Sequence, residues 1–131
     1  EQALKERNLA DLGPLLETEA LEMHSVMMTA KPAQHYLHPL TWELINWLRY
    51  WRQQTGKRAY FTLDAGPNLH ILHEPAVRAD LHDGLRRFVQ AKTERAHIRW
   101  IDDEMGDGPT LSVTPETTAP SAPAEVPRSS V

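Results

Sequence analysis

The residue in this sequence best placed to do chemistry is Asp64, which stands where a strand-like run meets a tight break. Residues 58–63 alternate and are rich in aromatic and β-branched side chains, as a half-buried strand requires. Residues 64–68 then read Asp-Ala-Gly-Pro-Asn, where Gly66 permits unusual backbone angles and Pro67 fixes its own φ. A carboxylate at a strand end is held rigidly, so it can orient a substrate or accept a proton. The alternative is ordinary turn chemistry, in which the aspartate only shapes the turn.

A second candidate is His24, which shares a helical face with Leu21, Met27 and Met28. A lone histidine among apolar neighbours is more often a satisfied core residue than a ligand. We therefore favour a place in the core for His24, and the sequence leaves its role open.

Composition excludes several functional classes. The 131 residues carry a formal net charge of −4, so we expect neither nucleic acid nor a membrane as a partner. The absence of cysteine excludes disulfides and thiolate metal sites, and His70 and His73 would point to opposite faces of a strand, so no metal site is expected. No apolar run approaches the roughly 20 residues that span a bilayer, and we expect a cytoplasmic location.

Since the sequence opens with Glu1, we expect it to be a piece of a longer protein.

The residues before the strand predict helices that must position it. Apolar side chains recur at spacings of three and four, interrupted by Pro14. Because proline is tolerated in a first turn, we expect a short helix over residues 2–7, a break, and a longer helix from about 12 to 28, capped by Asn8 or Asp11. The predicted apolar stripe consists of Leu9, Leu12, Leu15, Leu16, Ala20, Met23, His24 and Met27.

A second long helix is predicted between Pro39, which opens it, and Gly56, which closes it at its C-terminal cap. Its apolar face comprises Leu44, Ile45, Leu48 and Trp51, with Trp42 and Trp47 alongside. We expect the tryptophans to pack in the core, and Arg49 and Arg52 to lie on the solvated side.

The rest of the chain predicts one more helix and one more strand. The helix begins at Pro75, and Gly84 in its middle favours a close approach to the sheet. Residues 97–101 predict the last strand. The predicted fold is therefore α+β, with three antiparallel strands and helices on one side.

Two blocks of residues carry a family resemblance. Residues 60–68 read Tyr-Phe-Thr-Leu-Asp-Ala-Gly-Pro-Asn, and residues 22–32 read Glu-Met-His-Ser-Val-Met-Met-Thr-Ala-Lys-Pro. Both resemble motifs of the diphosphomevalonate (mevalonate diphosphate) decarboxylases of the GHMP kinase superfamily. The resemblance covers about residues 1–112, the C-terminal part of such an enzyme. It implies a ferredoxin-like antiparallel sheet whose first strand lies upstream and is missing here.

The resemblance implies a role for the residues of the turn. The family's aspartate at this place acts on the C3 hydroxyl of mevalonate 5-diphosphate while ATP phosphorylates it, so Asp64 is the expected catalytic residue. Loss of phosphate and CO2 then gives isopentenyl diphosphate, in the mevalonate pathway of isoprenoid and lipid biosynthesis. Phosphoryl transfer asks mainly for positioning, so a weakly basic carboxylate suffices. Ala65 and Gly66 offer backbone N–H groups beside it, where a substrate carboxylate or phosphate can approach.

The resemblance also places other functions outside this chain. ATP and Mg2+ are expected to bind mainly to the N-terminal part of the enzyme, so the 131 residues alone are expected to be inactive and to fold poorly. The full-length enzyme is expected to be a homodimer. Phosphomevalonate decarboxylase and mevalonate 3-kinase are the nearest alternatives, and the intact motif favours a decarboxylase over the kinase. The alternative without enzyme activity is a stand-alone ferredoxin-like interaction module.

The composition changes at Val113 to Pro, Thr, Ser and Ala, which predicts a domain over residues 1–112 and a disordered tail over residues 113–131. We expect deletion of the tail to shift the melting temperature by no more than about 2 °C, because few buried contacts are lost. Thermal unfolding of the truncated and intact proteins measures this shift. A large drop would mean that the tail docks on the domain.

Overall fold

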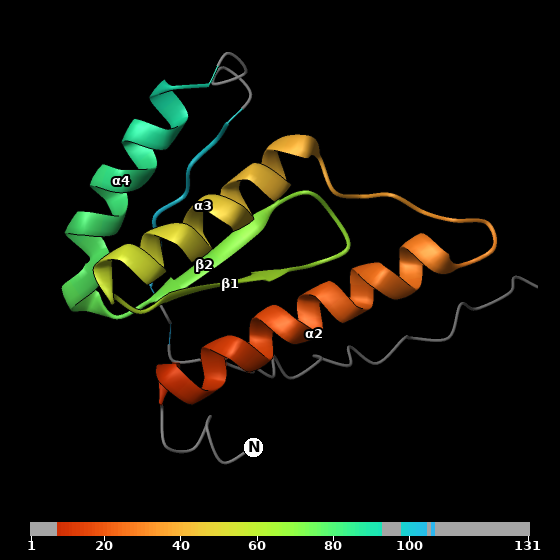
Figure 1. Cartoon of the computed structure of the whole chain (residues 1–131), viewed down its shortest axis with the longest axis horizontal. Coiled ribbons are helices and arrows are strands. Elements are labelled where there is room, and N and C mark those ends of the chain that lie inside the picture. The colour runs from red at the N-terminus through yellow and green to blue at the C-terminus, as the bar shows by residue number, and fades with distance from the viewer. Residues whose placement is uncertain (1–7, 93–97, 105, 107–131) are drawn as a thin grey trace, which may run out of the picture. The chain divides into compact units, whose positions relative to one another are not determined.

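The computed structural model describes residues 8–92, 98–104 and 106, and divides the chain into two units, Glu1–Arg99 and Trp100–Val131. The predicted helix over 2–7 and tail over 113–131 lie outside the described residues. The described helices and strands all belong to the first unit (Figure 1). Their order is α2 (Leu9–Thr29), α3 (Pro39–Thr55), β1 (Ala59–Leu63), β2 (Leu69–His73), the 3-10 turn η1 (Pro75–Val77) and α4 (Arg78–Gln90).

Helix α2 begins earlier than predicted, because Asn8 and not Asp11 caps it. The Asn8 side chain accepts the N–H of Ala10 over 3.0 Å, and it also donates to the Asp11 carboxylate over 2.6 Å. Pro14 therefore lies inside the helix, where it cannot donate a backbone hydrogen bond. The predicted stripe is wrong for Leu15, which is 62% exposed, and right for Ala20 and His24, which are buried as expected. The buried positions are Gly13, Glu17, Ala20 and His24.

Helix α3 has the predicted bounds. Pro39 occupies its first turn, and Gly56 ends it with a left-handed φ of 67°. Ile45 and Leu48 are fully buried, and each such side chain contributes roughly 1.5–3 kcal/mol to stability. The prediction that all the helix's tryptophans pack in the core is wrong for Trp42, which is 38% exposed.

The strands β1 and β2 form an antiparallel hairpin in which Phe61 pairs with Ile71. The predicted buried face of β1 is confirmed, because Ala59, Phe61 and Leu63 are all buried. The other face is not fully solvated as a half-buried strand would require, since Tyr60 is buried there as well. Together with side chains from the helices they make the core. Its other members are Ala20, Ile45, Leu48, Val77, Leu81 and Leu85. Helix α2 contacts β1 along its length (Figure 1).

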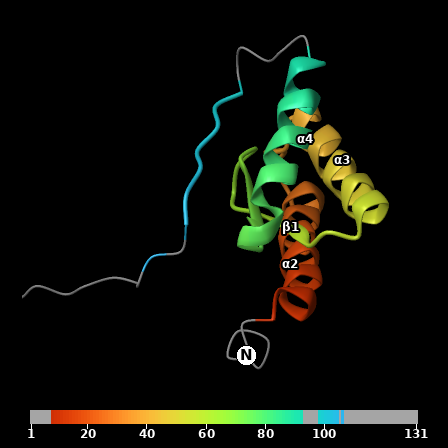
Figure 2. The same ribbon diagram turned by 90° about the vertical axis from the view of Figure 1, so that its left-hand side faces the viewer.

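Helix α4 lies beside α3, as the turned view shows (Figure 2). The rings of Trp47 and Phe88 are 5.5 Å apart. Gly84 permits this approach, since a Cβ there would lie 3.0 Å from the Trp47 ring and 3.1 Å from Nε1 of Trp51. The predicted close approach thus exists, but to α3 and not to the sheet.

The predicted third strand is not formed over residues 98–101, and His97 lies outside the described residues. The sheet of the described residues has two strands. A strand needs a neighbour to pair its backbone N–H and C=O groups, and an apolar alternation alone does not supply one. The α+β class is confirmed with two strands in place of three.

Candidate active site

Asp64 lies directly after β1, at the start of the turn that leads into β2. Its side chain is 90% exposed, so the carboxylate is open to a bound molecule. Its Oδ2 is 3.4 Å from Nε2 of His70, whose side chain is also exposed. The two meet because the register pairs Thr62 with His70, which makes Asp64 a diagonal neighbour on the same face of the hairpin.

The backbone of the turn is fastened at the carbonyl oxygen of Asp64. The N–H of Gly66 donates to this oxygen over 2.7 Å, and Nε2 of His24 lies 3.0 Å from it. The Gly66 N–H thus serves the turn itself, contrary to the expectation that it is offered to a substrate, whereas Ala65 is exposed. Gly66 also lacks the positive φ that Gly56 has, so it does not use the backbone freedom expected of it. Nothing lies within 4 Å of the place that a Cβ on Gly66 would take.

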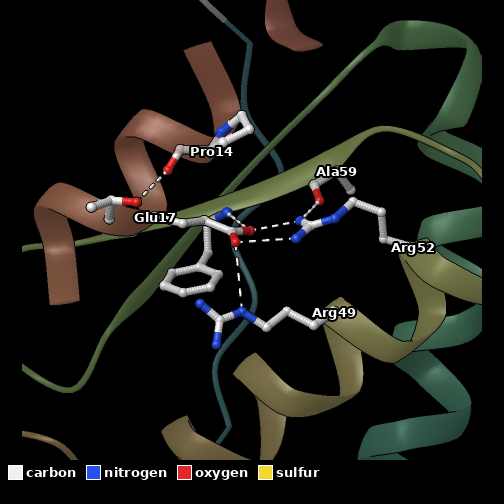
Figure 3. A network of polar contacts seen from close by, with 7 residues as sticks. Pro14, Glu17, Arg49, Arg52 and Ala59 are labelled. Atoms are coloured by element: carbon white, nitrogen blue, oxygen red, sulfur yellow. Dashed lines mark hydrogen bonds and ion pairs between the residues drawn. The ribbon is translucent and has the colours of Figure 1, made fainter. Parts of the chain in front are cut away.

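Beside the first half of β1, an ion pair between Glu17, which is buried, and Arg52 joins α2 to α3 (Figure 3). Glu17 is only 5% exposed, and its two carboxylate oxygens lie 2.6 and 3.1 Å from the Arg52 guanidinium nitrogens Nη1 and Nη2. Such two-point contacts are the strong geometry for arginine and a carboxylate. The same groups also reach β1. The Phe61 N–H donates to Glu17 over 3.4 Å, and Arg52 donates to the Ala59 carbonyl oxygen over 2.8 Å.

These two bonds identify the outer edge of β1. In an antiparallel ladder, alternate residues direct their N–H and C=O groups toward the partner strand and away from it. Phe61 and Ala59 direct theirs away from β2, so the Glu17–Arg52 pair occupies the place that another strand would have on this side. A buried backbone group without such a partner costs about as much as a lost hydrogen bond.

The prediction that Arg49 and Arg52 lie on the solvated side of α3 is wrong for Arg52. Its guanidinium carbon is also 4.4 Å from the centre of the Tyr60 ring, a cation–π contact. Arg49 is half-exposed, with Nε 3.6 Å from Glu17. The sequence analysis missed Glu17, although it stands four residues after Gly13 and three before Ala20, the small residues with which α2 approaches β1. A carboxylate between two small residues on one helical face is a signal that can be read from sequence.

Within the described part of the chain, no three His, Asp or Glu side chains gather into a group that could hold a metal ion. Nor does any helix there have the length and apolar character needed to cross a membrane. The described residues offer an exposed carboxylate on a fastened turn.

Comparison with known proteins agrees with the family resemblance found in the sequence. A family model described as the mevalonate 5-diphosphate decarboxylase C-terminal domain matches residues 1–128. A search of curated proteins found no match.

Several solved structures are similar to this chain. The mevalonate diphosphate decarboxylase from Enterococcus faecalis is 29% identical over 72% of this chain, with a TM-score of 0.62. The mevalonate pyrophosphate decarboxylase from Streptococcus pyogenes is 35% identical over 66% of this chain, also with a TM-score of 0.62. A complex of the related MDDEF with MVAPP, AMPPCP and magnesium is 28% identical over 72% of the chain, with the same TM-score. The match covers only 27–28% of each of these longer proteins.

The buried ion pair yields a prediction about stability. Replacing Glu17 by alanine leaves the Arg52 guanidinium and the Phe61 N–H without their acceptor, so we expect the free energy of unfolding to fall by roughly 3–5 kcal/mol. Glu17→Gln keeps an acceptor for the strand but loses the charge, and we expect a smaller loss. Denaturant unfolding of the protein that carries this chain measures both values.

The exposed pair of Lys57 and Asp80 provides a matched control. Asp80→Ala removes a carboxylate from an ion pair at the surface, and such pairs contribute at most about 1 kcal/mol. Equal losses for Glu17→Ala and Asp80→Ala would contradict a structural role for the buried pair.

Proposed function

Because the chain belongs to the family of mevalonate 5-diphosphate decarboxylase C-terminal domains, we propose that it works as the C-terminal domain of an ATP-dependent diphosphomevalonate decarboxylase, a carboxy-lyase. The reaction converts mevalonate 5-diphosphate and ATP to isopentenyl diphosphate, ADP, phosphate and CO2. The observation that carries the proposal is Asp64, an exposed carboxylate on a turn whose backbone is fixed to the helices.

The geometry suits a carboxylate that orients a hydroxyl and takes its proton late. Asp64 accepts the proton of the C3 hydroxyl as the oxygen bonds to the γ-phosphoryl group of ATP, and the O–H bonding pair stays on the oxygen that attacks phosphorus. A loose phosphoryl-transfer transition state asks for positioning more than for a strong base. The exposed Ala65 and the open space at Gly66 are proposed to admit the substrate beside Asp64.

ATP and Mg2+ are proposed as the cofactors of the complete enzyme. The similar structure of MDDEF contains AMPPCP and magnesium, which supports the proposed cofactors. It also contains MVAPP, which supports the proposed substrate. The described residues of this chain hold neither a glycine-rich phosphate loop nor a metal-binding group, so the larger N-terminal part is proposed to bind both. Bound ATP would supply the phosphoryl group, and this chain supplies the Asp64 carboxylate that orients the C3 hydroxyl and accepts its proton.

The motif around Asp64 favours a decarboxylase over a mevalonate 3-kinase, but it does not select between substrates with one or two phosphates. A phosphomevalonate decarboxylase uses a substrate with one phosphate fewer, and the choice between the two belongs to the proposed N-terminal part. The cytoplasmic location, the homodimer, and the division into residues 1–112 and 113–131 stay predictions.

The test of the proposed function is the Asp64→Asn variant of the complete protein. The substitution keeps the size of the side chain and removes its capacity to accept the proton, so we expect kcat to fall on the order of 10²- to 10⁴-fold with folding unchanged. Release of CO2 and of ADP from mevalonate 5-diphosphate and ATP measures the rate.

Asp83→Asn is a suitable control, because Asp83 is an exposed aspartate that pairs with Arg87 on α4. We expect this variant to retain the wild-type rate. Turnover of Asp64→Asn within about threefold of the wild type would remove Asp64 from the mechanism.

A further inference from the structure

The Asp64 carboxylate is not held by burial. Its side chain is 90% exposed, and Ala65, Pro67 and Asn68 of the same turn are exposed as well. Surface turns of this kind are more mobile than the elements that they connect. His70 lies 3.4 Å from the carboxylate but is itself exposed, so the position of the carboxylate depends largely on what fixes the backbone of the turn.

Two buried side chains from different helices supply that restraint. His24 on α2 is 2% exposed, and its Nε2 lies 3.0 Å from the carbonyl oxygen of Asp64. Thr41 on α3 is 6% exposed, and its hydroxyl donates to the carbonyl oxygen of Pro67 over 2.8 Å. The turn is thus bound near its start by one helix and near its end by the other.

We propose that His24 and Thr41 are positioning residues for Asp64, which set the place of its carboxylate by fixing both ends of the turn. This inference rests on the proposed function, in which Asp64 orients the C3 hydroxyl. It assigns a role to two side chains that do not themselves touch the substrate.

The chemistry of the two bonds favours this role over ordinary packing. A carbonyl oxygen only accepts, so Nε2 of His24 carries the proton in this contact. An apolar side chain of similar size would fill the same space and leave the carbonyl without this donor. Both bonds are also long-range in sequence, since they join residues 40 and 26 positions apart. Misplacement of a catalytic group by about 1 Å costs on the order of 10²-fold in rate, so small shifts of this turn are expected to matter.

Other histidine and threonine side chains make bonds of the same kind without reaching the turn. The ring of His73 contacts the carbonyl oxygen of its neighbour Glu74 at 3.0 Å, and Thr55 donates to Trp51 within α3 over 2.8 Å. They provide matched controls, because the same functional groups bond to backbone carbonyls elsewhere in the unit.

The experiment compares pairs of variants in the complete enzyme. His24→Phe and Thr41→Val keep the volume and remove the donor, whereas His24→Gln and Thr41→Ser keep a donor. We expect His24→Phe and Thr41→Val each to lower kcat roughly 10- to 100-fold, with little change in the KM for ATP. We expect His24→Gln and Thr41→Ser to recover most of the rate, and His73→Asn and Thr55→Val to stay within about twofold of the wild type.

Two further measurements separate positioning from other roles. The pH profile of kcat should be the same in His24→Gln as in the wild type, because His24 is proposed to donate a hydrogen bond to the turn and to take no proton from the substrate. Hydrogen exchange of a peptide spanning residues 62–70 should be faster in His24→Phe and Thr41→Val than in the controls. This second measurement does not depend on activity, so it tests the restraint even if Asp64→Asn shows that the proposed function is wrong.

The inference fails if His24→Phe and Thr41→Val keep the wild-type kcat, or if exchange in the turn is unchanged. It also fails if the donor-retaining variants lose as much activity as the donor-removing ones at equal thermal stability, since the bonds would then be irrelevant. If His24→Phe does not fold, the comparison of Thr41→Val with Thr41→Ser decides the question alone.

Discussion

The outer edge of β1 needs hydrogen-bond partners, and the way in which they are supplied determines how the helices are arranged. A strand edge carries N–H and C=O groups that must be paired when they are buried. Here the partners are charged side chains from two helices, Glu17 of α2 and Arg52 of α3. One ion pair therefore joins three elements at a single place, with its carboxylate on one helix and its guanidinium on the other.

The hydrogen bonds at the edge of β1 require α2 to approach the strand closely. Helix α2 presents Gly13 and Ala20 on either side of Glu17, so that its backbone comes close enough for the carboxylate to reach the strand. A Cβ on Gly13 would lie 2.2 Å from the Tyr60 ring, so the contact has no room for a larger residue. The apolar core gathers Phe61 of β1 with side chains of α3 and α4, and Ala20 of α2 also belongs to it. The edge bonds fix the place of α2, and the core supplies most of the stabilisation through burial.

The same helices also hold the site. The contacts of α2 with β1 continue from Glu17 to His24, which reaches the backbone of Asp64 just past the end of the strand. The carboxylate of Asp64 thereby stays exposed while its backbone is fixed, which is the combination that a group acting on a bound substrate requires. A buried aspartate would be held as well, but it would have no access to a substrate.

The local features of the fold could be predicted from the sequence. Pro39 and Gly56 predict the ends of α3, and the apolar positions of β1 predict its buried face, because steric preferences and periodicity act over a few residues. The motif around Asp64 led to the correct family. Three arrangements emerge in the folded chain alone: Glu17 is buried against Arg52, His24 and Thr41 bond to the turn, and Gly84 faces Trp47. Each of these contacts joins residues at least 26 positions apart, or joins two helices whose mutual approach no local pattern specifies. The predicted strand over residues 97–101 failed for the same reason over the part that is described, since pairing requires a neighbour as well as a suitable sequence.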